Sequence, residues 1–201
     1  MLFFVAFARP FMALFIGLRV RGREHLPAGD PFILIANHSS HLDTLSLLSL
    51  FPLRRLSRIR PCAAADYFER NRVVSFFSHT FFNILPIERG RPSMEDHPIR
   101  RMGEALSRGE SLILFPEGTR GPGERPASFR PGVAHLAREF PQVPVVPVYL
   151  ANMGRALPKG EFVPVPFFCE VRFGPPPRLK GTREEILETL HQAVIALQQP
   201  D

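Results

Sequence analysis

The sequence has few of the residues that metal sites, disulfide scaffolds and covalent catalysis require. Its two cysteines, Cys62 and Cys169, lie 107 positions apart, which excludes a zinc cluster and a disulfide-rich scaffold and fits a reducing, cytosol-facing compartment. The chain contains neither a His-Glu-x-x-His sequence nor a Cys-His cluster, so we expect no metal ion and no cofactor. It also lacks the Gly-x-Ser-x-Gly sequence that presents a nucleophilic serine.

Lysine is scarce as well, and its scarcity shapes the charge of the protein. Only Lys159 and Lys180 are lysines, so the net charge of +6 comes almost entirely from arginine, whose planar fork suits phosphate oxygens. Anionic lipid, an acidic carrier protein and nucleic acid are the partners that such a charge allows. Because the arginines are dispersed and the aromatic residues are mostly Phe within apolar runs, we expect no nucleic-acid partner.

A long apolar run begins the chain, but it is short for a membrane span. Within residues 1–18 only Arg9, Pro10 and Gly17 are not apolar. A helix of this length reaches about 27 Å, whereas the hydrocarbon core is roughly 30 Å thick. Arg9 and Pro10 also oppose a span, because a charge and a helix breaker would lie at its middle. We therefore predict a kinked, membrane-associated helix over residues 1–18 that lies in one leaflet.

A basic flank follows this run at Arg19, Arg21 and Arg23, as is typical of a segment that faces cytoplasmic headgroups. We therefore expect the protein at the cytoplasmic face of the inner (plasma) membrane. A signal peptide is an alternative, although it would place the basic residues before the apolar run. A helix buried in the core is the other alternative.

The remaining residues, 19–201, alternate apolar runs of strand length with longer helical patterns. With 45% hydrophobic residues in 201, the chain is long enough for a sizeable core. The alternation predicts a single α/β domain with a largely parallel sheet flanked by helices. Strands are expected over 32–36, 59–63, 84–87, 111–115, 145–150 and 168–173. Helices are expected over 42–50, 67–82, 93–108, 132–140 and 183–197.

Two polar side chains follow the strand at 32–36, where ligand and catalytic groups of α/β sheets gather. His38 falls in the turn after the strand, and Asp43 falls in the first turn of the next helix. An Asp that accepts from one imidazole nitrogen leaves the other nitrogen able to take a proton from a hydroxyl. Alternatively, Asp43 caps the helix and His38 satisfies a buried carbonyl. His41 is a competing partner for Asp43.

Three further segments place polar residues after apolar runs. Residues 111–120 end in Pro-Glu-Gly-Thr-Arg, where Gly118 allows close backbone approach and Arg120 offers a fork for phosphate. A P-loop is excluded, because Glu124 stands where its lysine should be. Residues 84–90 end in Arg89 and Gly90, for which a solvated turn is the alternative. Residues 143–149 form an apolar run with two prolines, which suits a core strand, an edge strand or a wall that faces a ligand.

Taken together and in this order, these four segments resemble the PlsC-like glycerolipid acyltransferases, the family of lysophosphatidic acid acyltransferases. The stretch from Asn37-His38 to Asp43 resembles the first block of the family, residues 87–90 the second, residues 115–120 the third and residues 145–148 the fourth. The resemblance implies a glycerolipid acyltransferase domain over residues 19–201. It also implies acyl transfer from acyl-CoA or acyl carrier protein to the hydroxyl of a lysophospholipid at a membrane surface, most simply giving phosphatidic acid.

The resemblance also implies roles for individual residues. His38 would be the general base, Asp43 would orient it, and no acyl-enzyme would form. The acceptor site would comprise Arg89, Glu117, Gly118, Thr119, Arg120 and Arg130. Residues 129–132 depart from the lysine-rich version of many relatives, and a single apolar segment stands in place of a longer helical pair. A hydrolase that uses water, such as a lysophospholipase or thioesterase, and a non-catalytic lipid binder are the rival functions.

Overall fold

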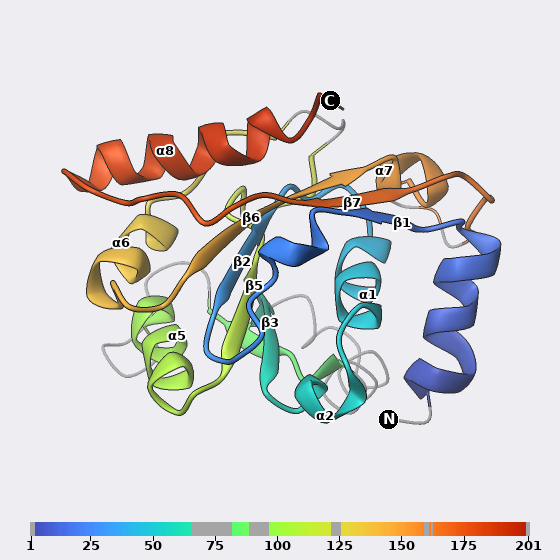
Figure 1. Cartoon of the computed structure of the whole chain (residues 1–201), viewed down its shortest axis with the longest axis horizontal. Helices are drawn as coiled ribbons and strands as arrows, with labels where there is room; N and C mark the ends of the chain where they lie inside the picture. Colours follow the sequence, from blue (N-terminus) through green and yellow to red (C-terminus); the bar gives the residue numbers. More distant parts are fainter. Residues whose placement is uncertain are drawn as a thin grey trace.

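The computed structural model describes residues 3–65, 82–88, 97–121, 126–158, 161 and 163–199 (Figure 1). Within them a seven-stranded sheet has the order β1-β7-β6-β2-β5-β3-β4. The strands are β1 Arg19–Arg21, β2 Ile33–Ala36, β3 Ile59–Ala64, β4 Leu85–Ile87, β5 Ser111–Leu114, β6 Val145–Ala151 and β7 Glu170–Phe173. The pair β6 and β7 is antiparallel and the other neighbouring pairs are parallel, which confirms the predicted α/β fold with a largely parallel sheet.

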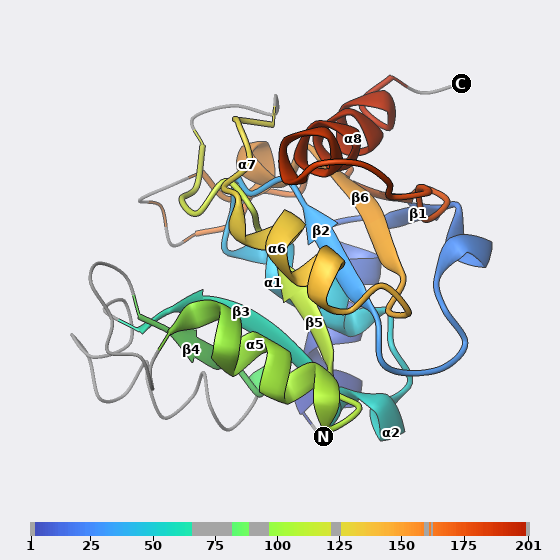
Figure 2. The same ribbon diagram turned by 90° about the vertical axis from the view of Figure 1, so that its left-hand side faces the viewer.

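Helices cover both faces of the sheet, so the domain has three layers. In Figure 2, α5, α6 and α8 lie on the face toward the viewer, while α1 lies on the far face, as does the N-terminal helix. The α-helices of the described residues are α1 Leu42–Ser49, α2 Leu53–Leu56, α5 Pro98–Ser107, α6 Gly132–Glu139, α7 Met153–Ala156 and α8 Arg183–Ala196. Each face has its own hydrophobic cluster, and β2 alternates between them: Leu34 and Ala36 face α1, whereas Ile33 and Ile35 face the other layer.

The predicted elements agree with this structure except at short segments. All six predicted strands are present, whereas β1 was not predicted because its Arg-Val-Arg sequence resembles a basic flank. The single-turn helices α2 and α7 were also missed. The predicted helix 67–82 lies outside the described residues except for residue 82, and the described part of 93–108 is helical from Pro98. The run at 143–149 is a core strand and not an edge strand, because β6 lies between β2 and β7 and is wholly buried.

The N-terminal helix comprises residues 3–15 and consists mostly of two π-helical turns, Phe4–Ala8 and Phe11–Phe15, with Pro10 between them. Its inner face packs into the cluster beside α1, and its outer face is exposed. The inner residues, each at most 2% exposed, are Phe4, Ala8, Met12 and, just after the helix, Ile16. The exposed large hydrophobic residues of the helix are Val5, Phe7, Leu14 and Phe15. Among the described residues, no helix has the length and hydrophobicity that a membrane crossing requires.

Arg9, whose charge would be costly within a bilayer, has a structural role at the end of α1. Its Nε donates to the carbonyl of Ser49 at 3.2 Å, and its Nη2 donates to the carbonyl of Phe51. Arg23 donates to the carbonyl of Leu50 at 3.0 Å. These carbonyls lack partners within the helix and carry its negative partial charge, so the two arginines cap the C-terminus of α1. Arg9 thereby joins the N-terminal helix to α1.

Candidate active site

The loop between β2 and α1 places His38 and Asp43 at the carboxyl edge of the sheet. Asn37 fixes the beginning of this loop: its Nδ2 donates to the carbonyl of Leu150 at 3.0 Å, and its Oδ1 accepts from the Leu150 N–H at 2.7 Å. Asp43 is fully buried, and its Oδ2 lies 2.7 Å from Nδ1 of His38. The structure therefore brings together the base and the orienting residue that the sequence predicted.

Asp43 also organises the backbone before α1. The same Oδ2 accepts from the N–H groups of Ser39 at 2.7 Å and Ser40 at 2.9 Å. Both groups lie just ahead of the first helical turn, where a carboxylate is favoured by the exposed amides. The N-cap residue of α1 is His41, so Asp43 lies within the first turn and fixes the backbone before the helix. The same carboxylate bonds to the ring of His38, and its role in orienting a base stays a prediction.

The ring of His38 is held in one plane and remains accessible. It stacks on Phe115, with 4.2 Å between the ring centroids and 20° between the planes, and 21% of its side chain is exposed. Because the Asp43 carboxylate only accepts, Nδ1 of His38 is the donor, and Nε2 carries the lone pair. That nitrogen can therefore accept a proton from a hydroxyl. Sequence reasoning did not give Phe115 this role, since the two rings are 77 positions apart.

His41 pairs with Arg120, whereas the carboxylate of Asp43 bonds to His38. Nη1 of Arg120 donates to Nε2 of His41. Burial lowers the pKa of His41, and the positive charges of Arg120 and His38 lower it further. A neutral His41 can accept the hydrogen bond from a guanidinium, whereas a protonated one cannot. The pair holds the half-exposed Arg120 beside the loop of the predicted base.

The loop after β5 is bonded to the backbone of His38 from two sides. Oε1 of the buried Glu117 accepts from the His38 N–H at 2.9 Å, and the Gly121 N–H donates to the His38 carbonyl at 2.9 Å. Burial raises the pKa of Glu117, and the N–H groups of His38 and Ala127 partly offset this effect. The side chain of Glu117, expected in the acceptor site, thus binds the loop that carries the base.

Gly118 and Arg130 lie against each other although twelve positions separate them. Gly118 has a φ of +76°, and a Cβ at this position would collide with the guanidinium of Arg130. The Arg130 N–H donates to the carbonyl of Pro116 at 2.9 Å, and its side chain crosses Gly118 toward the carbonyl of Glu117. Thr119 is exposed at the same turn. Arg89, the remaining predicted acceptor residue, lies outside the described residues.

Helix α7 supports the loop between β2 and α1 from a direction that the sequence did not indicate. The hydroxyl of Ser40 donates to the carbonyl of Leu157 at 2.8 Å. Gly154 packs against Ser39, and a Cβ added there would lie 3.2 Å from that of Ser39. The small residues at 39, 40 and 154 were the available signal, but only the fold shows that they meet.

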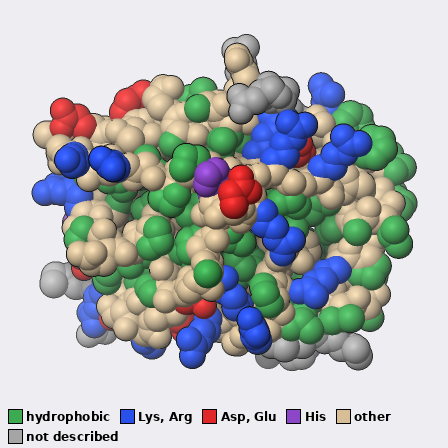
Figure 3. Space-filling model, viewed as in Figure 1, with side chains coloured by type: hydrophobic (Ala, Val, Ile, Leu, Met, Phe, Trp, Pro, Cys, Tyr) green, Lys and Arg blue, Asp and Glu red, His purple; other side chains and the backbone are tan. Residues whose placement is uncertain are grey.

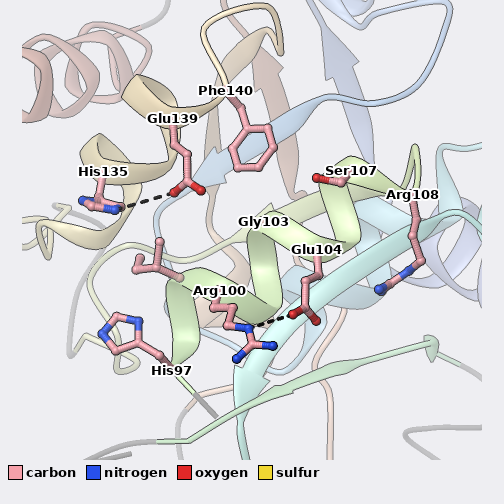
Figure 4. Close-up of a pocket in the computed structure, with 10 residues that line it drawn as sticks. His97, Arg100, Gly103, Glu104, Ser107, Arg108, His135, Glu139 and Phe140 are labelled. Carbon is pink, nitrogen blue, oxygen red and sulfur yellow. Dashed lines mark hydrogen bonds and ion pairs between the residues drawn. The ribbon is translucent and has the colours of Figure 1, made fainter. Parts of the chain in front are cut away.

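A surface pocket of about 790 Å³ lies elsewhere, between α5 and α6 (Figure 4). Two ion pairs in its wall lie within single helices: Arg100 with Glu104 at 3.0 Å, and His135 with Glu139 at 3.6 Å. None of the predicted site residues lines it. In the part of the chain that the structure describes, no group of three His, Cys, Asp or Glu residues could hold a metal ion.

The fold and the site define an α/β domain with a His-Asp pair built into the edge of its sheet. A family model described as Acyltransferase matches residues 17–151, and the chain belongs to this family. The chain is 28% identical to the chloroplastic 1-acyl-sn-glycerol-3-phosphate acyltransferase LPAT1 of Arabidopsis thaliana, an alignment that covers 73% of this chain and 39% of the relative. It is 28% identical to the 1-acyl-sn-glycerol-3-phosphate acyltransferase of Pseudomonas aeruginosa, over 88% of this chain and 65% of the relative.

A solved structure has the same fold. The 1-acyl-sn-glycerophosphate (LPA) acyltransferase PlsC of Thermotoga maritima superposes with a TM-score of 0.78 at 24% identity, over 97% of this chain and 77% of that chain. The chain spans about two fifths of the length of the chloroplastic relatives that it matches in Arabidopsis thaliana and Brassica napus. The comparisons therefore establish the family and the fold.

Proposed function

We propose that this protein transfers an acyl group from a thioester to the free hydroxyl of 1-acyl-sn-glycerol-3-phosphate, giving phosphatidic acid. The 2.7 Å contact between His38 and the buried Asp43 carries the proposal, because it creates a base for a hydroxyl without a protein nucleophile. Membership of the Acyltransferase family supports acyl transfer. The relatives in Arabidopsis thaliana and Pseudomonas aeruginosa are named as 1-acyl-sn-glycerol-3-phosphate acyltransferases, which supports this acceptor.

In this reaction His38 acts first as a general base and then as a general acid. Nε2 of His38 takes the proton of the acceptor hydroxyl while its oxygen attacks the thioester carbonyl. The tetrahedral intermediate then expels the thiolate of coenzyme A or acyl carrier protein. The imidazolium gives its proton to this thiolate, which leaves as the free thiol. The Asp43 carboxylate stabilises the imidazolium between the two steps and fixes the ring through Nδ1. An ester forms and a thioester breaks, so the reaction requires neither a cofactor nor an acyl-enzyme.

The acceptor phosphate is assigned to the loop after β5. Arg120 and Arg130 belong to this region, which is hydrogen-bonded to the backbone of His38, and a guanidinium can bind two phosphate oxygens at once. Gly118 leaves room for Arg130, and we keep Thr119 and Arg89 as further acceptor residues. Glu117 acts as a positioning residue, because its carboxylate holds the His38 backbone.

The substrates place the reaction at a membrane surface. The outer face of the N-terminal helix exposes 86% of Leu14 and 55% of Phe7, which is suited to insertion among lipid headgroups and chains. We propose that this helix lies in one leaflet at the cytoplasmic face of the membrane. Its inner face remains in the protein core.

Product analysis tests this function. Purified protein in mixed micelles is given radiolabelled acyl-CoA or acyl carrier protein with lysophosphatidic acid, and with lysolipids of other headgroups as controls. Labelled phosphatidic acid is expected, together with a preference for lysophosphatidic acid. Label released only as free fatty acid would contradict the proposal in favour of the hydrolase. Binding of lysophosphatidic acid without any turnover would indicate the non-catalytic alternative.

A further inference from the structure

The exposed large hydrophobic side chains of the described residues lie on only two segments. One is the outer face of the N-terminal helix. The other is the stretch of residues 163–168 that precedes β7. It exposes Val163 (78%), Val165 (52%), Phe167 (37%) and Phe168 (71%). We propose that residues 163–168 form a second membrane contact, which docks on a bilayer containing anionic lipid. The proposal builds on the membrane-surface function given above.

The segment is held in place with these side chains outward. The Val165 N–H donates to the carbonyl of Ala156 at 2.8 Å, and Nδ2 of Asn152 donates to the carbonyl of Phe168 at 3.0 Å. Apolar side chains on a backbone fixed in this way cannot turn inward without losing those bonds. Exposed apolar groups of this kind mark an interaction surface.

The segment is continuous with the outer face of the N-terminal helix. Gly17 follows the helix, and a Cβ at this position would lie 2.8 Å from the ring of Phe168. Figure 3 shows hydrophobic side chains gathered at the edge that carries the N-terminal helix in Figure 1, with Lys and Arg side chains beside them. A helix and a neighbouring segment that insert together define how the domain is oriented on a surface, which one helix alone does not.

The charges at this surface favour an anionic bilayer as the occupant. The guanidinium of Arg19 lies 5.6 Å from the centre of the Phe168 ring, and that of Arg155 lies 5.5 Å from the centre of the Phe167 ring. Both arginines are exposed. Aromatic rings at the depth of the headgroups, with arginines beside anionic phosphates, are typical of membrane interfaces. The net charge of +6 acts in the same direction.

Helix α7 links this surface to the catalytic loop. The Ala156 carbonyl binds the Val165 N–H, and the next carbonyl, that of Leu157, accepts from the hydroxyl of Ser40 at 2.8 Å. Only this short element separates residues 163–168 from the loop of His38. Docking through the segment would therefore bring the base close to the headgroup region, where the hydroxyl of a lysolipid lies.

Single tryptophans test the contact directly, because the chain contains no Trp. In the Val165→Trp variant we expect a blue shift and strong quenching on vesicles of phosphatidylglycerol with brominated chains. The Ala196→Trp variant on α8, across the sheet, is the control and should show neither. Unchanged emission at position 165 would overturn the proposal. A shift that appears without vesicles as protein concentration rises would indicate a second copy as the occupant and would overturn it as well.

Adding negative charges to the surface gives an independent test. Val163→Glu/Val165→Glu should weaken binding to anionic vesicles about tenfold or more, whereas Ala196→Glu/Gln199→Glu adds the same two charges without this effect. Activity in mixed micelles should persist, since both valines are exposed and lie outside the catalytic loop. Unchanged vesicle affinity would contradict the proposal. If these variants support the contact but the wild-type protein makes no phosphatidic acid, only the proposed function is refuted.

Discussion

At the residue scale, the proposed chemistry depends on one carboxylate oxygen of Asp43, which accepts from three donors. In Asp43→Asn, the amide oxygen can still accept from His38 Nδ1 and from the N–H groups of Ser39 and Ser40, but the negative charge is lost. The imidazolium is then less stable, so we expect kcat to fall about 10² to 10⁴-fold while the fold is kept. Steady-state kinetics with circular dichroism checks this expectation. A normal kcat would show that Asp43 only fixes the backbone before α1.

His41 gives the stability of the protein a dependence on pH. Its folded-state pKa lies below the ordinary value of 6.5, so the unfolded chain binds a proton that the folded protein refuses. The free energy of unfolding should therefore decrease as pH falls below about 6.5, toward the lowered folded pKa. In His41→Gln this decrease should be smaller. Urea unfolding of both proteins between about pH 7 and pH 5 measures the difference, and identical slopes would contradict the assigned environment.

The sequence predicted the part of the site that is local and missed the part that is long-range. His38 and Asp43 are five positions apart, so a strand end and a helix start suffice to bring them together. The contacts of Glu117 with His38 and of Arg130 with Gly118 depend on the packing of separate loops. Neither contact has a periodicity or a spacing that reveals it in advance.

At the scale of elements, α1 is fixed at both ends, and its C-terminus depends on Arg9. Arg9→Met would leave the carbonyls of Ser49 and Phe51 without this donor, and we expect a loss of about 2 kcal/mol in the free energy of unfolding. Arg54→Met, at an exposed position of α2, is the control and should change it by less than about 0.5 kcal/mol. Urea unfolding checks both variants, and equal effects would show that Arg9 does not support α1.

Strands were predicted well because buried parallel strands are continuous apolar runs, as in Ile33–Ala36 and Ser111–Leu114. The environment of the N-terminal helix was harder to predict, since both of its faces are apolar and composition cannot distinguish a core face from a lipid face. Its Arg9 indicated a cost within a bilayer, but the helix end that it caps lies 40 positions away.

At the scale of the whole molecule, the proposed membrane attachment and the folding of the domain depend on opposite faces of the same helix. Deleting residues 1–18 would remove Arg9 and uncover the cluster beside α1, so a deletion cannot separate the two roles. Val5→Glu/Leu14→Glu changes only the exposed face, and we expect it to move from the membrane fraction to the soluble fraction with an unchanged Tm. Met12→Glu places a charge in the core and should unfold the protein. Retention of Val5→Glu/Leu14→Glu on membranes to the same extent as the wild type would contradict this division of roles.

The two histidines of the catalytic loop allow the most direct test of the account. Phosphatidic acid formation is measured for His38→Ala and His41→Ala beside the wild type, with the same lysophosphatidic acid and acyl donor. Because the ring of His38 bonds to Asp43 and that of His41 bonds to Arg120, His38→Ala should lose about 10² to 10⁴-fold in kcat, while His41→Ala should stay within about tenfold and raise the KM for the acceptor. A fully active His38→Ala, or a His41→Ala with the larger loss in kcat, would contradict the assignment of the base.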